Sequence, residues 1–205
     1  MELQQKTKTD NNGLIPPYGG ELKNLIIKDK NLKNDLISKA TYEFECSERN
    51  ACDVELLMVG AFSPLEGFMD EHNYNSVIKN NRNTNGVLFG LPIVFDSNNE
   101  KVKAGETILL TYKKQKIAVL EVSSKWEPDK SLEAELCYGT NSLDHPAVKM
   151  IFNDRIVVIF IHKTFQWRKS SNHQKFYIAC ISLATFKLIS SFRDKIIFKV
   201  FILDN

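Results

Sequence analysis

The sequence predicts an α+β fold in which helices dominate the first part of one domain, residues 14–155, and strands the second. Two observations carry this prediction. Apolar residues recur at helical spacing between residues 47 and 79, and the spacing changes to strand-like alternation after residue 87. The 205 residues are 43% apolar and 25% charged, a composition typical of globular proteins with a sizeable core. We expect the strands to curl into a small barrel.

The first forty residues are predicted to form a polar terminus, a turn and short elements. Residues 1–13 are polar, and we expect them to be disordered. Residues 14–20 combine Pro and Gly with Leu, Ile and Tyr, which indicates a rigid turn packed onto the domain. Apolar residues between 22 and 39, interrupted by an Asp/Asn/Lys-rich stretch, predict short helical segments. Residues 41–46 alternate polar and apolar side chains, which predicts a strand.

Two helices are predicted in the next forty residues. Ser47 is a suitable N-cap for the first, because its hydroxyl can accept a hydrogen bond from an unpaired backbone N–H. That helix places Cys52, Leu56 and Val59 on one face, and Gly60 ends it. Asp70 is expected to cap the second helix, which ends in a polar loop at residues 80–86.

The segment from Gly60 to Met69 joins these helices and is strongly constrained. Gly60 allows backbone angles that other residues resist. Pro64 suits the first turn of a new helix, and Ser63 and Glu66 have the spacing of a capping box. The segment is also too apolar for a solvated loop, so it is interpreted as a buried structural junction.

The second part of the domain is predicted to contain strands. Residues 87–95 form a strand candidate, where Pro92 implies an edge position or a bulge. Residues 107–112 and 116–122 flank a short polar loop at 113–115, which predicts a hairpin. A turn is expected at residues 127–130.

Two short helical elements are predicted after the hairpin. The first begins at Ser131, reaches Tyr138 and is closed by Gly139. The second begins at Asp144-His-Pro146.

The C-terminal residues differ from the rest of the chain. Residues 147–205 contain neither Gly nor Pro over 59 positions, where average usage predicts about seven. Residues 156–205 hold eight Lys/Arg and two Asp/Glu, a balance of +6. A buried strand is expected at 156–161, and the rest of this divergent tail, 156–205, shows no clean periodicity.

Several classes of protein are disfavoured by the sequence. The cysteines at 46, 52, 137 and 180 show no C-x-x-C pair, so we expect cytoplasmic thiols rather than disulfides. Metal binding is not expected without paired ligands. The N-terminus lacks the apolar region of a signal peptide, and the six-residue apolar run at 156–161 is far shorter than the roughly 20 residues that span a bilayer.

Residues 14–153 resemble the N-terminal domain of ATP sulfurylase (sulfate adenylyltransferase). The similarity covers about two-thirds of the chain, and the motifs follow the family's order. They are Pro17-Tyr-Gly-Gly20, Ser47-Glu-Arg-Asn-Ala-Cys-Asp-Val-Glu-Leu-Leu57, Gly60–Met69, Leu91-Pro-Ile-Val94, Ile117-Ala-Val-Leu-Glu-Val122, Trp126-Glu-Pro-Asp-Lys130, and Tyr138-Gly-Thr140 through His145-Pro146. Tyr18, where the family usually has His, and Val59, where Asn is common, depart from the pattern.

The resemblance implies a PUA-like fold, a small mixed barrel with flanking helices that precedes a catalytic domain. In the family, that catalytic domain uses ATP, Mg²⁺ and sulfate to make adenylyl sulfate and pyrophosphate, in sulfate assimilation. The enzymes are often homo-oligomeric, and the domain packs on its own catalytic domain. The catalytic motifs Gln-x-Arg-Asn-Pro, His-x-x-His and Gly-Arg-Asp do not occur in these 205 residues.

The resemblance therefore predicts a nucleotidyltransferase fragment without catalytic, cofactor-binding or metal-binding residues of its own. We expect the chain to be truncated and inactive alone. The abrupt change near Asp154-Arg155 suggests the hypothesis that residues 156–205 are translated out of frame.

Three groups of residues are candidate sites. Arg49, Asp53 and Glu55 could form a charged cluster, which is more typical of surface or interface salt bridges. His145 has no nucleophile partner in the sequence and is interpreted as a turn histidine. The tail contains basic and aromatic residues that could contact RNA, although nucleic acid is an unfavoured partner. These are His162, Trp167, Arg168, Lys169, His173 and Lys175.

One alternative stays open. The chain could be a free-standing PUA-like module that binds RNA or a protein partner. The motif set favours the sulfurylase family over RNA-binding PUA domains.

Overall fold

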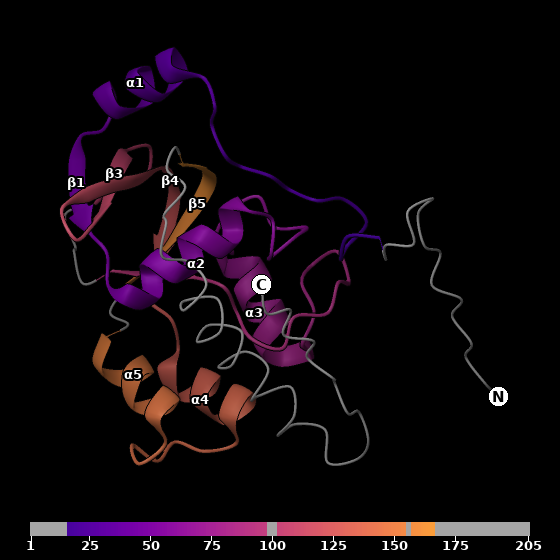
Figure 1. Cartoon of the computed structure of the whole chain (residues 1–205). Coiled ribbons are helices and arrows are strands. Elements are labelled where there is room, and N and C mark those ends of the chain that lie inside the picture. The colour runs from indigo at the N-terminus through magenta and orange to yellow at the C-terminus, as the bar shows by residue number, and fades with distance from the viewer. Residues whose placement is uncertain (1–15, 98–101, 155–156, 167–205) are drawn as a thin grey trace, which may run out of the picture. The chain divides into compact units, whose positions relative to one another are not determined.

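The computed structural model describes residues 16–97, 102–154 and 157–166. These residues form an α+β domain with one mixed sheet (Figure 1). The elements in chain order are α1 (Lys30–Ser38), β1 (Tyr42–Glu45), α2 (Glu48–Met58), α3 (Glu71–Asn80), β2 (Phe95–Ser97), β3 (Thr107–Tyr112), β4 (Gln115–Trp126), α4 (Lys130–Tyr138), α5 (Pro146–Asp154) and β5 (Val157–Gln166). The predicted fold class is confirmed.

The sheet has the strand order β1-β3-β4-β5-β2. β1 runs parallel to β3, and the other pairs are antiparallel. β4 spans 12 residues and pairs with both β3 and β5, with irregularities in its ladder to β5 at residues 120–124. Such irregularities bend a strand and increase its twist. The long, bent β4 is therefore the central connection of the sheet.

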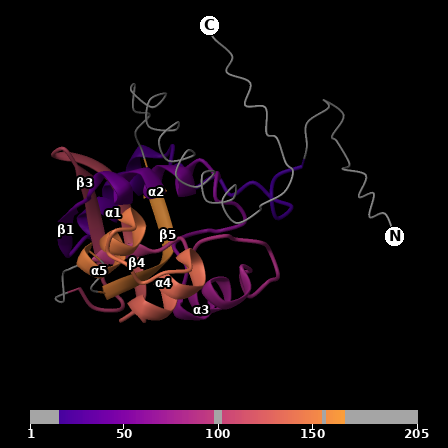
Figure 2. The same cartoon turned by 90° about the horizontal axis from the view of Figure 1, so that it is seen from below.

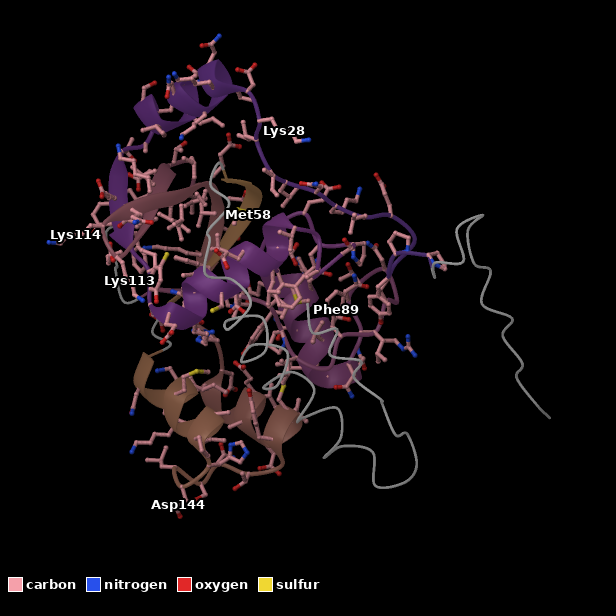
Figure 3. All side chains as sticks on the ribbon, viewed as in Figure 1. Lys28, Met58, Phe89, Lys113, Lys114 and Asp144 are labelled. Carbon is pink, nitrogen blue, oxygen red and sulfur yellow. The ribbon has the colours of Figure 1, made fainter. Side chains whose placement is uncertain are left out.

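The predicted hairpin is present, with a tighter loop than expected. β3 and β4 are joined by Lys113 and Lys114, which are labelled in Figure 3. Their φ angles are 50° and 62°. Two consecutive positive φ angles are the geometry of a type I′ turn, whose twist matches that of the strands. Lysine is an uncommon residue there, so the sequence gives only a weak signal for it.

The predicted helix caps are largely confirmed. The Ser47 side chain accepts from the backbone N–H of Asn50, and the Asp70 side chain accepts from that of Asn73. Gly139 ends α4 with a φ of 69°. The helix itself begins one residue before Ser131, because Asp129 rather than Ser131 caps it.

The predicted strand at residues 87–95 is wrong. Only residues 95–97 form a strand, and the preceding stretch is irregular apart from a single bridge between Arg82 and Leu88. The apolar side chains that suggested a strand are used differently. Phe89 and Val94 pack against Tyr74, Val77 and Ile78 of α3 in a core cluster of their own. The residues before β2 are therefore apolar because they are buried against α3, although their backbone is not paired in the sheet.

The main core lies between α2 and one face of the sheet. Successive strand residues point to opposite faces. The face toward α2 contributes Ile108, Leu110, Ala118 and Leu120, which cluster with Val54, Leu57 and Met58 of α2. The opposite face contributes Leu109 and Val119, which pack with Leu36 of α1. The sheet is thus covered on both faces, as the views in Figures 1 and 2 show.

α3, α4 and α5 form a helical group beyond the sheet. α4 and α5 lie side by side (Figures 1 and 2), and the Lys130 ammonium donates to the Phe152 carbonyl at 3.1 Å. α3 is tied to α4 by a buried hydrogen bond of 2.8 Å from the Tyr74 hydroxyl to the Glu133 carboxylate. No helix within the described residues has the length and apolar character needed to cross a membrane.

The strand predicted at 156–161 lies at 157–166 as β5, which pairs with β2 and β4. The sheet thus extends beyond residue 155. The predicted division of the chain at that residue stays a prediction. Residues 1–15 and 167–205, which include the predicted disordered terminus and most of the tail, lie outside the described residues.

Candidate functional site

The junction between α2 and α3 is held by the preceding segment of the chain. Gly60 has a φ of 81°, and a Cβ on it would lie 2.7 Å from the Leu22 side chain and 2.9 Å from the Lys23 carbonyl oxygen. The backbone N–H of Leu25 donates to the Met58 carbonyl at 2.9 Å. Residues 22–25 therefore cross the end of α2 at a distance that only glycine permits.

The predicted capping box in this junction is wrong. No helix begins at Pro64, where the chain forms turns and the Ser63–Pro64 peptide bond is cis. The Ser63 hydroxyl donates to the Gly60 carbonyl at 2.6 Å and accepts from the Lys23 backbone N–H at 3.0 Å. The Glu66 carboxylate lies 2.8 Å from the Lys23 ammonium. Both predicted capping groups are thus engaged by Lys23, which lies 40 positions before Ser63 and 43 before Glu66, so local spacing could not reveal it.

A shallow pocket of about 160 Å³ opens beside this junction. It is lined by Pro64, Leu65, Glu66, Gly67, Phe68, Met69, Asp70, Asn73, Asn83 and Asn85. Its carboxylates have other roles, since Asp70 caps α3 and Glu66 pairs with Lys23. The described residues contain no group of three His, Cys, Asp or Glu side chains arranged to hold a metal ion. The pocket therefore offers polar contacts, and its carboxylates already serve the α3 cap and the Lys23 ion pair.

The predicted charged cluster is present in altered form. Arg49 forms ion pairs with Asp53, at 3.7 Å, and with Asp96 on β2. Glu55 lies two positions beyond Asp53, and residues at that spacing take different faces of a helix. Asp96 is only 5% exposed, and its carbonyl accepts from the Asn50 side chain at 3.1 Å. The cluster therefore fastens α2 to β2.

Asp96 was missed by the sequence analysis. It lies 47 positions from Arg49 and directly follows an apolar stretch that was interpreted as a strand. No local motif marks it, because the ion pair depends on how the fold brings α2 and β2 together.

His145 lies at the start of α5, where its carbonyl accepts from the Lys149 N–H at 3.0 Å. Its ring meets Tyr138 edge-on, with the centroids 5.2 Å apart. The buried Nδ1 atom has no hydrogen-bond partner in the part of the chain that the structure describes. The position at a helix start agrees with a turn histidine, and a catalytic role remains without geometric support.

The described cysteines are thiols rather than halves of disulfides. Cys46 and Cys52 are buried, and Cys137 is half-buried. Burial, with a smaller contribution from the Glu45 charge, raises the pKa of Cys46 from 9.0 to about 12. Because the thiolate is the nucleophile, Cys46 is unreactive at neutral pH. Cys180 lies outside the described residues.

Most of the basic and aromatic residues of the tail lie outside the described residues. His162 belongs to β5, where the structure describes the backbone. Trp167, Arg168, Lys169, His173 and Lys175 lie outside the described residues.

Comparison with known proteins gives concordant results. Residues 15–160 match the family model described as a PUA-like domain. The chain is 41% identical over 146 residues to a sulfate adenylyltransferase of Neurospora crassa, covering 67% of this chain and 25% of that protein. It is 40% identical over 139 residues to one of Schizosaccharomyces pombe, covering 64% of this chain and 28% of that protein. The chain thus spans about a quarter of the length of these relatives.

A solved structure supports the fold alone. A hexameric APS kinase from Thiobacillus denitrificans superimposes with a TM-score of 0.56 and 21% identity. The match covers 83% of this chain and 31% of that one. The similarity extends over most of this domain and a minor part of the larger protein.

Proposed function

The chain belongs to the PUA-like domain family, and from this membership we propose that it is the non-catalytic N-terminal domain of a sulfate adenylyltransferase. The observation that carries the proposal is its identity of 37–41% to fungal sulfate adenylyltransferases over about two-thirds of its length. Because the chain matches only a quarter of those proteins, the activity of the whole enzyme is not carried over to it.

The chemistry of adenylyl transfer supports a non-catalytic role. Transfer at a phosphoryl group depends on cations and donors that are positioned to stabilise charge on its oxygens. The described cations near the junction and α2 are already engaged: Lys23 by Glu21 and Glu66, and Arg49 by Asp53 and Asp96. We propose that ATP, Mg²⁺ and sulfate bind to a catalytic domain on which this domain packs.

A pyrophosphate-release assay tests this proposal. The purified full chain is incubated with ATP, Mg²⁺ and sulfate, with the Schizosaccharomyces pombe relative as the active control. We expect release no faster than in a sample without protein. Robust sulfate-dependent turnover by the chain alone would contradict the non-catalytic assignment. Salt-sensitive RNA binding by the same sample would instead favour a nucleic-acid-binding module.

A graft tests the positive part of the proposal. The segment of the Schizosaccharomyces pombe relative that matches this chain is replaced by residues 16–153, and pyrophosphate release is measured. We expect the chimera to fold and retain activity. A matched chimera carrying Gly60→Val should lose stability and activity together, because the side chain meets the backbone of residues 22–23. A folded but inactive first chimera would contradict the proposed packing role.

We also propose that the protein is cytoplasmic, since its described cysteines are thiols, which persist in reducing compartments. Cell fractionation tests this proposal. Recovery in a membrane or secreted fraction would contradict it.

The out-of-frame hypothesis for residues 156–205 remains a proposal, and two observations now bear on it. The family model reaches residue 160, and β5 pairs with two strands of the sheet. If the frame changes, either it changes after residue 155, so that β5 is partly native, or β5 is an apolar segment of foreign sequence that completes the sheet. Translating the encoding DNA in the other two frames distinguishes these cases, because it shows where the similarity to the family resumes. If neither frame yields the missing catalytic motifs downstream, the hypothesis fails.

A further inference from the structure

The loop after α3 carries an Asn–Gly pair that the proposed function does not use. Asn85 and Gly86 are both exposed. The Gly86 N–H donates to the Asn83 carbonyl at 2.9 Å, and the Asn83 N–H donates to the Val87 carbonyl at 2.9 Å. Gly86 has a φ of 79°, the left-handed geometry that follows a type I turn in a bulged hairpin. The Asn–Gly pair therefore sits at the tip of a small, defined turn.

Asn83 holds this turn closed. Its side-chain oxygen accepts from the backbone N–H groups of Asn85, at 3.1 Å, and Val87, at 2.9 Å. Asn83 is only 4% exposed, whereas Asn85 lies at the surface and lines the pocket beside the junction. The buried Asn83 side chain thus holds the turn, while Asn85 is exposed to solvent.

We propose that Asn85 is a site of covalent self-modification by deamidation. The backbone nitrogen of Gly86 attacks Cγ of Asn85, and the bond from Cγ to Nδ2 breaks. The amide nitrogen leaves as ammonia and takes up the proton that the Gly86 nitrogen loses. Water then opens the resulting succinimide at either carbonyl, which leaves aspartate or isoaspartate. The sequence of steps requires no oxidant or reductant, and water is its one co-reactant.

The local structure favours this chemistry at Asn85. Asparagine is among the thermolabile residues of proteins. Glycine has no side chain to shield its nitrogen from the neighbouring Cγ, and a Cβ built on Gly86 would meet no atom within 4 Å, so the space around the turn is open. Ring closure does require the Gly86 N–H to leave the Asn83 carbonyl. Opening of the turn therefore sets the rate of the reaction.

The product would change the pocket. Deamidation replaces a neutral amide with a carboxylate among lining residues that already include Glu66 and Asp70. Isoaspartate also adds a methylene group to the backbone, which disturbs the bond between Gly86 and Asn83. The modification therefore makes the pocket rim more negative and loosens the turn.

A second asparagine provides an internal control. Asn141 is exposed and precedes Ser142, whose N–H is also engaged, donating to the Thr140 hydroxyl at 3.1 Å, and the Asn141 amide itself donates to the Glu135 carboxylate at 3.2 Å. The full chain is incubated at mildly alkaline pH, digested, and analysed by tandem mass spectrometry for acid at each position. We expect Asn85 to convert several-fold faster than Asn141. Equal or slower conversion at Asn85 would overturn the proposal.

Two variants test the mechanism, with circular dichroism confirming that each is folded. Gly86→Ala should still slow conversion at Asn85 several-fold, although the left-handed φ of 79° strains an alanine there, because the added Cβ hinders attack by the nitrogen. Asn83→Ala should accelerate it, because the turn loses the acceptor that closes it. Should Asn83→Ala not fold, Gly86→Ala decides alone. Unchanged rates in the folded variants would contradict both attack by the Gly86 nitrogen and restraint of the turn by the Asn83 side chain.

Discussion

Gly60 occupies a position where both the backbone angle and the surrounding space exclude a side chain. We predict that Gly60→Ala destabilises the domain more than Gly105→Ala does. Gly105 has a similar φ of 88°, but a Cβ there would meet nothing within 4 Å, whereas at Gly60 it would meet the Leu22 side chain and the Lys23 carbonyl. The left-handed angle alone costs about 1–2 kcal/mol, and overpacking adds about 1–3 kcal/mol.

Urea unfolding of the two glycine variants and the parent chain measures this difference. Equal losses in the free energy of unfolding would show that the segment at residues 22–23 yields to the added methyl group. The close crossing would then contribute no packing constraint.

Cys46 gives a prediction about alkaline pH. Burial raises the pKa of the folded-state thiol from 9.0 to about 12, so the folded state binds this proton more tightly than the unfolded state does. The stabilisation is therefore complete below pH 9.0 and is lost as the pH rises toward 12. We expect the parent chain to lose more stability above pH 9.0 than Cys46→Ala, which lacks the titrating group.

The measurement is the urea midpoint of the parent and of Cys46→Ala at a series of pH values. The difference between the two chains removes the contribution of the other groups that titrate at alkaline pH. Parallel pH profiles would contradict the assigned pKa and its cause.

At the scale of elements, the helix caps and ends that the sequence predicted correctly depend on residues close together in the chain. Ser47 and Asp70 cap helices through amides three residues away, and Gly139 ends α4 through its own backbone angle. These signals lie within one helical turn, so a pattern in the sequence captures them. Ser63 has the same side-chain chemistry, yet it serves the Lys23 backbone instead. The capping box failed there because a distant segment competes for the same groups.

The prediction at the scale of elements concerns the ion pair that joins α2 to β2. Arg49→Ala should lower the free energy of unfolding by roughly 1.5–3 kcal/mol, since it leaves the buried Asp96 carboxylate without this charged partner. Lys39→Ala is the matched control. Its pair with Asp35 is 2.7 Å long, but both side chains are more than half exposed, and such pairs contribute about 0.5 kcal/mol or less.

Chemical denaturation of both variants gives the comparison. A double-mutant cycle with Asp96→Asn then isolates the interaction between Arg49 and Asp96. A coupling energy near zero would mean that the cluster is incidental to the docking of α2.

At the scale of the whole molecule, the sheet is the feature that local patterns could not predict. β1 pairs in parallel with β3, which begins 65 residues after β1 does, and β2 pairs with β5 rather than with its neighbours in sequence. Alternation predicts that a strand exists, but pairing depends on contacts across the chain. The family resemblance supplied the fold at this level because it compares the order of motifs over the whole domain. The ion pair of Arg49 with Asp96 escaped prediction for the same reason.

The exposed face of residues 22–28 gives the last prediction. Even-numbered residues there are exposed and odd-numbered ones half-buried, as in a strand with one face on the core. Leu22 is 54% exposed and Ile26 39%. Apolar surface of this kind promotes association when nothing covers it. We expect the chain to self-associate as its concentration rises, and Leu22→Ser with Ile26→Ser to reduce that association.

Sedimentation velocity over a range of concentrations measures the effect. Leu136→Ser with Leu143→Ser is the control, because it removes two equally apolar side chains, 46% and 56% exposed, from the α4 region. If both double variants reduce association alike, the cause is total exposed apolar area rather than residues 22–28. A parent chain that stays monomeric at every concentration would show that this face does not cause association.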